Sequence, residues 1–318
     1  MPVSLPAALD PILPLLRCPS CGAELSPAAG ALRCPRRHSF DVARHGYVSL
    51  LTGTRATSGD DGPMARARRD FLAAGRYEPI RAAVADLATE ADLSSGADLA
   101  SGADLVSGAG LASGADLASG ALSASGVGRR PATVVDVGCG TGYYLAGVLD
   151  ALPAAVGLGL DTSAHALRAA AKAHERAAAA TWDVFRPFPI ASELVDVVLD
   201  VFAPRNPAEF HRVLRPGGVL VVVRPFGGHL AELRRQVTQM VAVDPDKEQR
   251  LHQALDPHFE AARTQRVEYN TPLTPQEAVD LVLMTPSARH VTEAELHDDG
   301  ELPDQVTVSV LATAYRRR

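Results

Sequence analysis

The sequence predicts an α/β protein in which a mostly parallel sheet carries helices on both faces and follows a small cysteine-containing module. Three observations lead to this prediction. Short apolar runs alternate with helical segments from residue 131 onward, a glycine-rich loop follows the first run, and three of the four cysteines lie near the N-terminus. Strands that alternate with helices are typical of parallel sheets buried on both faces.

Composition and charge restrict the class of protein. The chain has 318 residues, a formal net charge of −6 and 47% hydrophobic residues, which excludes a wholly disordered or fibrous chain. No run approaches the ~18–20 apolar residues of a membrane helix and no secretory leader opens the chain, so we expect a soluble, cytoplasmic protein. Residues 1–81 carry 11 Arg and 7 acidic residues, a balance of +4. This basic segment fits docking on a polyanion, with chance segregation as the alternative.

The N-terminal part contains a cluster of metal-binding residue types. Residues 1–17 are rich in Pro and Leu and are predicted to be a loose lead-in. They precede the spacing C-x2-C-x12-C-x3-H, formed by Cys18, Cys21, Cys34 and His38. Four such ligands fill the tetrahedral shell of Zn²⁺ and leave no position for water, so we predict a structural zinc site. Buried or redox-active cysteines are the alternative.

Arginines and aromatic residues surround this cluster. Arg33, Arg36 and Arg37 are predicted to contact RNA phosphates, since guanidinium groups make charge-assisted hydrogen bonds to them. Phe40 and Tyr47 are expected either to stack on unpaired bases or to form the small core of the zinc module.

The stretch from Met64 to Leu87 has helical composition and is interrupted near Gly75 and Pro79. Residues 91–120 repeat a hexapeptide close to Ala-Asp-Leu-Ala-Ser-Gly, which offers too little apolar surface to offset ordering and is predicted to be flexible rather than a β-helix. We divide the chain into a zinc-binding module (1–55), a helical connector (56–90), a low-complexity insertion (91–130) and the α/β domain (131–318).

The α/β domain begins after Pro131. Its predicted strands are Thr133–Val137, Ala155–Leu160, Leu194–Val201, Val219–Val223, Arg263–Tyr269 and Gln305–Tyr315. Its predicted helices are Ser163–Ala178, Pro207–Leu214 and Glu277–Met284. The last two strands alternate apolar and polar residues, so we expect them to be partly antiparallel.

The first strand runs into the loop Asp136-x-Gly-x-Gly-x-Gly142. Glycines let the backbone approach a ligand, and the helix that follows offers free amides. The loop is one residue tighter than the dinucleotide pattern and has an acid at its start, which suits cationic S-adenosylmethionine, a ligand without a pyrophosphate. Asp161, after the second strand, suits a ribose diol, with a helix N-cap as the alternative. The turn at 214–218 before a Val-rich strand resembles the class I methyltransferase fold, and this resemblance implies that Asp183, at the end of the third strand, accepts a hydrogen bond from the adenine amino group. The loop residues singled out for this cofactor are Asp136, Gly138, Gly140 and Gly142.

With these motifs the chain resembles the RlmA family of large-subunit rRNA guanine-N1 methyltransferases, including the actinobacterial macrolide-resistance branch. Besides the zinc knuckle and the glycine loop, the matching segments are 38–43, 46–51, 59–60, 67–75, Tyr77, 201–204, 229–230 and 284–286. The resemblance implies a Rossmann-like class I S-adenosylmethionine-dependent methyltransferase domain, an N-terminal zinc module that recognises 23S rRNA, and a homodimer. It also implies that Tyr77, Gly140, Thr141 and His229 contact the cofactor.

The implied reaction transfers a methyl group to N1 of a guanosine in a 23S rRNA hairpin of the helix 35 region, with macrolide resistance as a hypothesis. Because N1 carries a proton that must leave, a base or a solvent path is needed. Asp200, at the end of a strand, is the candidate base, and fixing the loop that follows is its alternative role. Phe202 and Pro204 are predicted to sandwich the extruded base, and Arg205 to meet its phosphate. A methyltransferase for a small natural product and a non-catalytic zinc RNA-binding protein remain as alternatives.

Overall fold

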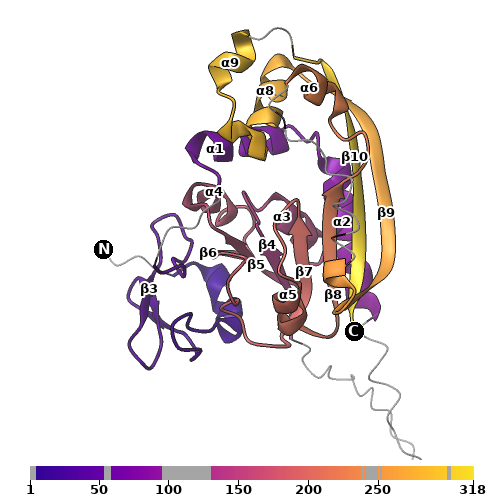
Figure 1. Ribbon diagram of the computed structural model, residues 1–318. Helices are drawn as coiled ribbons and strands as arrows, with labels where there is room; N and C mark the ends of the chain where they lie inside the picture. Colours follow the sequence, from indigo (N-terminus) through magenta and orange to yellow (C-terminus); the bar gives the residue numbers. More distant parts are fainter. Residues whose placement is uncertain are drawn as a thin grey trace, which may run out of the picture.

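The computed structural model describes residues 5–53, 59–94, 130–237, 240, 250, 253–298 and 302–318. In Figure 1 an α/β domain occupies the centre, and the N-terminal module lies beside the edge of its sheet. Residues 95–129, the bulk of the predicted insertion, lie outside the described residues, and the division into four parts stays a prediction.

The N-terminal module consists of a 3-10 helix, η1 (Ala7–Leu15), and three short antiparallel strands, β1 (Ser26–Ala28), β2 (Ala31–Arg33) and β3 (Ser39–Asp41). The prediction of a loose lead-in is wrong for the residues of η1. Leu9 and Ile12 are almost fully buried there, because η1 packs against β5 and β6 of the main sheet.

Two helices connect this module to the sheet, α1 (Gly62–Ala73) and α2 (Glu78–Ser94). Asp61 caps α1 by accepting a hydrogen bond from the backbone N–H of Met64 at 3.0 Å. The predicted interruption is confirmed: Gly75 has φ of +76°, in the left-handed region where a side chain is strained.

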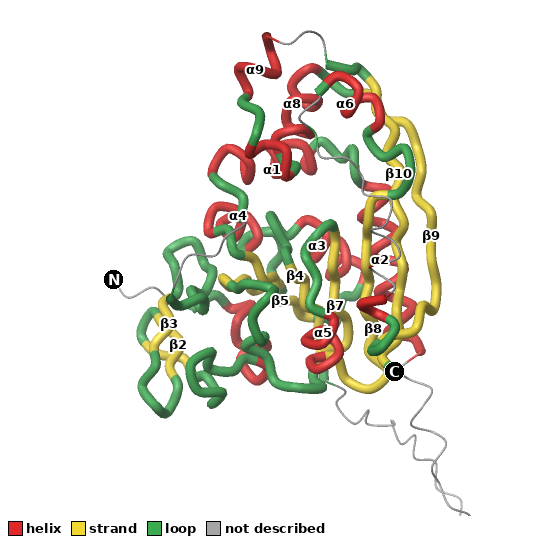
Figure 2. Tube along the Cα trace, in the orientation of Figure 1, coloured by secondary structure: helices red, strands yellow, loops and turns green. Residues whose placement is uncertain are grey.

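The main sheet has seven strands in the order β6-β5-β4-β7-β8-β10-β9 (Figure 2). The strands β4 to β8 pair in parallel, whereas β10 is antiparallel to both β8 and β9. Their bounds are β4 (Thr133–Val137), β5 (Val156–Asp161), β6 (Ala177–Thr181), β7 (Val195–Val201), β8 (Leu214–Pro225), β9 (Phe259–Pro272) and β10 (Gln305–Arg317). The predicted α/β class, its strands and the antiparallel pair at the end are confirmed.

Short helices surround the sheet. They are α3 (Tyr143–Ala151), α4 (Ala164–Ala170), α5 (Pro207–Val213), α6 (Ala231–Gln236), α8 (Pro275–Leu283), η2 (Pro286–Arg289) and α9 (Glu293–Asp298). The helix predicted over Ser163–Ala178 is too long, because β6 already begins at Ala177: a run of alanines does not distinguish helix from buried strand. Among the described helices, none has the length and apolar character needed to cross a membrane.

The sheet separates two apolar cores. One core contains α2, α3 and α8, and the other contains η1, α5 and the N-terminal module. Side chains alternate along a strand, so Val134 of β4 belongs to the first core, whereas Val135 and Val137 belong to the second. The same alternation decides on which side each strand-end acid lies.

Candidate cofactor pocket and metal site

The four predicted zinc ligands meet in space. The Sγ atoms of Cys18 and Cys34 each lie 3.4 Å from Nδ1 of His38, and the Sγ atoms of Cys21 and Cys34 are 3.7 Å apart. All four ligand atoms fall within 4.8 Å of one another. Ligands at about 2.1–2.3 Å from a tetrahedral centre are about 3.5–3.8 Å apart, so this arrangement has the size that Zn²⁺ requires.

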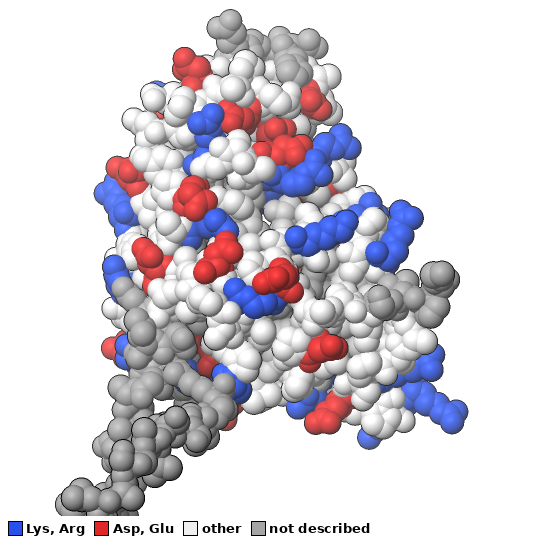
Figure 3. Space-filling model, turned by 180° about the vertical axis from the view of Figure 1, so that it is seen from behind, with Lys and Arg blue, Asp and Glu red and all other residues white. Residues whose placement is uncertain are grey.

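The residues around this cluster that were predicted to contact RNA differ in their exposure. Arg33, Arg36 and Arg37 are exposed and form no ion pair with any described residue. Phe40 is 2% exposed and belongs to the core of the module, whereas Tyr47 packs beside α4. Seen from behind, basic side chains project from the molecular edge where this module lies, and both signs alternate elsewhere (Figure 3).

The module is joined to the edge of the main sheet. Val48 forms a parallel bridge to Ala180 of β6, and its N–H donates to the carbonyl of Ala179 at 2.9 Å. The N–H of Leu51 donates to Oγ1 of Thr181 at 3.0 Å. The metal site is therefore connected through the backbone to the strand that ends just before Asp183.

The glycine loop turns sharply between β4 and α3. Gly138, Gly140 and Gly142 all have positive φ, and the N–H groups of Gly138 and Cys139 donate to the carbonyl of Leu160. A Cβ atom on Gly138 would lie 2.6 Å from the Cβ of Ala203, so this position has no space for a side chain.

A small pocket lies over this loop. Its walls come from segments far apart in the sequence: α1 and the residues after it, the glycine loop, the end of β7 and the end of α8. The lining residues are Arg68, Leu72, Tyr77, Asp136, Gly138, Cys139, Gly140, Thr141, Tyr143, Tyr144, Val201, Phe202 and Met284. Five of the predicted cofactor residues and one predicted substrate residue are among them.

Asp136 is the acid inside this pocket. Its side chain is 1% exposed, and its Oδ2 atom makes no hydrogen bond with any described residue. Burial, followed by the charges of Asp161 and Asp200, raises the pKa of this carboxyl to about 8. A buried carboxylate without a partner is costly. A cationic ligand removes that cost, so the pocket fits the positively charged S-adenosylmethionine.

The other two predicted cofactor acids lie at neighbouring strand ends. Asp161 accepts hydrogen bonds from the N–H groups of Gly140 and Ser163, both at 2.8 Å, and burial nevertheless raises its pKa. Ser163, rather than Asp161, caps α4. Asp183 is half-buried, accepts from the N–H of Phe185 at 3.0 Å and does not line the pocket.

Aromatic rings cover the open side. Phe202 is 37% exposed, has φ of +55° and lies with its ring 6.1 Å from that of His229 in a stacked arrangement. Tyr77 lies 6.3 Å from Phe202 and 6.4 Å from His229. Burial, with a smaller effect of Arg234, lowers the pKa of His229 to about 4. The ring is therefore neutral, and its Nδ1 atom accepts the N–H of Ser309 at 3.2 Å.

Asp200 lies apart from this arrangement. It is fully buried, and alternation along β7 directs it to the opposite face from Val201, which lines the pocket. Nε of Arg205 lies 3.6 Å from its carboxylate. This ion pair matches the alternative role of Asp200, which is to fix the loop after β7, and the phosphate contact of Arg205 stays a prediction. Pro204 is exposed in the same loop.

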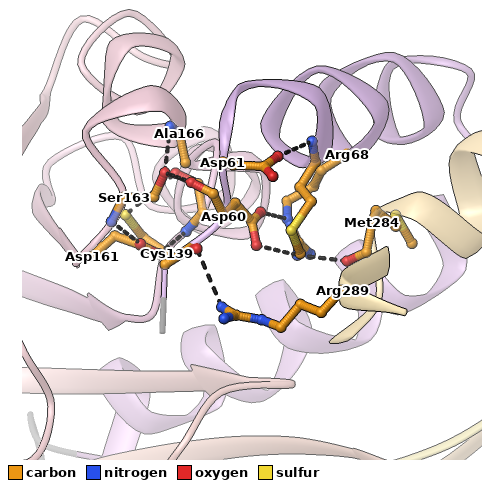
Figure 4. A network of polar contacts seen from close by, with 12 residues as sticks. Asp60, Asp61, Arg68, Cys139, Asp161, Ser163, Ala166, Met284 and Arg289 are labelled. Atoms are coloured by element: carbon orange, nitrogen blue, oxygen red, sulfur yellow. Dashed lines mark hydrogen bonds and ion pairs between the residues drawn. The ribbon is translucent and has the colours of Figure 1, made fainter. Parts of the chain in front are cut away.

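Arg68 lines the pocket and pairs with Asp60, and the local sequence patterns did not point to either residue. Their ion pair lies beside the glycine loop in Figure 4. The only signal for them was that both fall in segments that carried the family resemblance, 59–60 and 67–75.

Sequence profiles of two known families match the chain. One is described as the N-terminal region of RlmA, a zinc ribbon, and matches residues 16–55. The other is described as a methyltransferase domain and matches residues 134–218. The two matches coincide with the metal cluster and with the strands that carry the pocket.

Curated relatives cover nearly the whole chain. A protein of Micromonospora griseorubida, named as a 23S rRNA (guanine-N(1)-)-methyltransferase, is 43% identical over 315 residues, 96% of this chain and 98% of that protein. The 23S rRNA (guanine(748)-N(1))-methyltransferase of Streptomyces fradiae is 38% identical over 95% of this chain and 96% of that protein. The chain thus belongs to the RlmA family of 23S rRNA (guanine-N1)-methyltransferases, as its own motifs predicted.

Proposed function

We propose that this protein transfers a methyl group from S-adenosylmethionine to N1 of a guanosine in a hairpin of 23S rRNA, in the helix 35 region. The observation that carries the proposal is the near full-length similarity to the Streptomyces fradiae protein, whose name specifies guanine 748 and N1. The pocket over the glycine loop and the metal cluster supply the two parts that such a reaction needs.

The pocket supports the proposed cofactor. When bound, S-adenosylmethionine supplies an electrophilic methyl group on a sulfonium centre. Asp136 stabilises positive charge there, and the glycine loop lets the backbone approach the ligand. Tyr77 and Thr141 line the same space, which supports their proposed contact with the cofactor. Asp161 and Asp183 are proposed to hold the ribose and the adenine at the ends of β5 and β6.

The exposed ring of Phe202 supports a base-stacking role at the mouth of the pocket. An unpaired guanine on this ring would have its edge beside the space over the glycine loop. The proton on N1 needs an acceptor or a path to solvent. Because the geometry directs Asp200 away from the pocket and His229 is neutral with a low pKa, we propose that the proton leaves to solvent rather than to either side chain.

The N-terminal ribbon is proposed to hold Zn²⁺ through its Cys3His cluster and to dock the RNA. Arg33, Arg36 and Arg37 are exposed cations that can reach phosphates, and the backbone junction with β6 keeps the ribbon at a defined distance from the pocket. Protection of ribosomes from a macrolide is proposed as the consequence of the methylation.

Primer extension tests the substrate. N1-methylguanine blocks the Watson–Crick edge and stops reverse transcriptase, so ribosomal RNA from cells that express the protein should give a new stop in the helix 35 hairpin. Purified protein with S-adenosylmethionine and unmodified 23S rRNA should give the same stop. Absence of the stop in both experiments would contradict the proposed substrate.

A further inference from the structure

We propose that Arg68 binds the α-carboxylate at the amino-acid end of the cofactor, opposite Asp136, which faces the α-ammonium group. This inference rests on the proposed function for the identity of the cofactor. It assigns a ligand contact to the connector helix α1, a segment outside the methyltransferase domain that the sequence profile matches.

Arg68 extends from α1 across the glycine loop. It lines the pocket together with Gly140, and a Cβ atom on that glycine would lie 3.1 Å from Cδ of Arg68. The side chain of Arg68 therefore packs over Gly140 and leaves no space for a side chain there. Of the described residues that line the pocket, Arg68 is the only cation and Asp136 the only carboxylate.

The guanidinium group is held in place by three hydrogen bonds. Its Nε and Nη2 atoms donate to the two carboxylate oxygens of Asp60 at 2.7 and 3.2 Å, and Nη2 also donates to the carbonyl of Met284 at 2.7 Å (Figure 4). No described residue accepts a hydrogen bond from Nη1. The N–H groups on Nη1 are thus the ones left for a ligand.

The segment that carries Asp60 is itself anchored. The hydroxyl of Ser163 donates to the carbonyl of Asp60 at 2.6 Å, and Arg289 donates to the carbonyl of Gly59 at 3.3 Å. Asp60 therefore acts as a positioning residue, because it orients Arg68 before a ligand arrives. A guanidinium group oriented in advance loses less entropy when it binds a carboxylate.

The charges of the pocket match a zwitterion. An α-amino acid presents a carboxylate and an ammonium group a few ångströms apart, and its recognition needs one group of each sign. Arg68 supplies the positive group, and Asp136 supplies the negative group when it is ionised. Both lie in a partly buried space, where charge-assisted hydrogen bonds are strongest. A purely structural Arg68 would tie α1 to the end of α8 through Nε and Nη2 alone, and it would not need to line the pocket.

Calorimetry with two thioether nucleosides tests the contact. S-adenosylhomocysteine carries the amino-acid end, whereas 5′-methylthioadenosine lacks it and is otherwise closely similar. In Arg68→Gln we expect the Kd for S-adenosylhomocysteine to rise by about tenfold to a hundredfold, with the Kd for methylthioadenosine unchanged. Arg66→Gln, which changes an exposed arginine of the same helix, should alter neither Kd.

Two further variants separate the contact from a structural role. Arg68→Lys keeps the cation but loses the fork, so it should give a smaller loss that is again confined to S-adenosylhomocysteine. Asp60→Asn should show the same selectivity through misplacement of Arg68. An equal loss for both ligands, or no loss for either, would overturn the inference.

The outcome is distinguishable from failure of the proposed substrate. A wild-type protein that binds S-adenosylhomocysteine through Arg68 but gives no stop in primer extension would retain this inference and contradict the RNA target. A wild-type protein that binds neither nucleoside would overturn the inference together with the proposed cofactor.

Discussion

The zinc ribbon and the cofactor pocket are built in opposite ways. The ribbon assembles its four ligands from residues 18–38, and the ligand atoms lie within 4.8 Å of one another before any metal is considered. The pocket gathers its walls from α1, β4, β7 and α8, and it leaves one buried carboxylate oxygen without a partner. The four ligand atoms of the ribbon can fill the coordination shell of a metal ion, whereas the pocket contains a carboxylate oxygen that is available to a ligand.

This difference has energetic consequences. A filled tetrahedral site contributes its binding energy to folding, so loss of one ligand removes structure. An open pocket with orphaned charges costs stability until the ligand arrives, so loss of one group changes affinity more than stability. The predictions that follow test this contrast, from the largest expected effect to the smallest.

Replacing a zinc ligand should have the largest effect. In Cys21→Ser we expect the ribbon to unfold, because structural zinc sites in isolated fingers contribute on the order of 10 kcal/mol. Metal analysis should show one zinc per wild-type chain and none in the variant, and thermal unfolding should show an earlier transition. Cys139→Ser, which alters a cysteine outside the cluster, should keep the zinc. A variant that loses zinc and keeps the wild-type unfolding curve would contradict a structural role.

Gly138→Ala should damage the loop itself. The new Cβ atom would lie 2.6 Å from that of Ala203 in a residue with φ of +71°, so we expect the free energy of unfolding to fall by roughly 1–3 kcal/mol and cofactor binding to be lost. Gly227→Ala is the matched control, because a Cβ atom there meets no atom within 4 Å. Equal denaturant midpoints for the two variants would contradict the prediction.

The affinity for the cofactor should depend on pH through the ionisation of Asp136. With its pKa raised to about 8, this carboxyl is protonated near neutral pH and charged above it. The Kd for S-adenosylmethionine should therefore fall, by about tenfold, as the pH rises through about 8. Asp136→Asn should lose this fall. The sulfonium charge of the ligand does not titrate, so its attraction to Asp136 persists when the α-ammonium group of the ligand loses its proton.

The free energy of unfolding of the ligand-free protein should show the opposite pH dependence. Because the unfolded carboxyl ionises at its ordinary, lower pKa, the contribution of Asp136 to the free energy of unfolding should decrease as the pH rises from about 4 to about 8. Denaturant titrations of wild type and Asp136→Asn at several pH values would measure it. A variant no more stable than wild type at high pH would contradict the raised pKa.

Phe202→Ala should weaken RNA binding without affecting the cofactor. Loss of one stacked base costs about 1–3 kcal/mol, so we expect KM for the hairpin RNA to rise about tenfold while the Kd for S-adenosylmethionine stays within twofold. Phe202→Tyr keeps the ring and should retain the wild-type KM. A loss of cofactor affinity in Phe202→Ala would instead place the ring in the cofactor site.

Single changes at Arg36 and Arg37 should have the smallest effects. Each phosphate contact that is lost should lower the slope of log K against log salt concentration by about 1 and weaken all RNA sequences equally. Filter binding at several salt concentrations with Arg36→Gln and Arg37→Gln measures this slope. An unchanged slope in both variants would indicate that the RNA crosses another part of the surface.

The sequence predictions were most accurate for sets of residues that lie close together in the chain. The metal site and the loop from Asp136 to Gly142 were predicted from spacing alone, because their members are neighbours in the chain. Element boundaries were less accurate where composition was uniform, as in the alanine run that ends in β6, and where apolar residues of the lead-in proved to be buried.

Two features of the pocket depend on tertiary structure alone. Asp136 and Asp200 are both acids at strand ends, yet alternation and the order of strands place one in the pocket and pair the other with Arg205 on the opposite face. Arg68 lies over the glycine loop only because α1 packs there. Local patterns determine which residues can be ligands, since spacing within a turn or strand is set by backbone geometry. Which of them share one pocket depends on contacts between segments far apart in the chain, and these are set by packing.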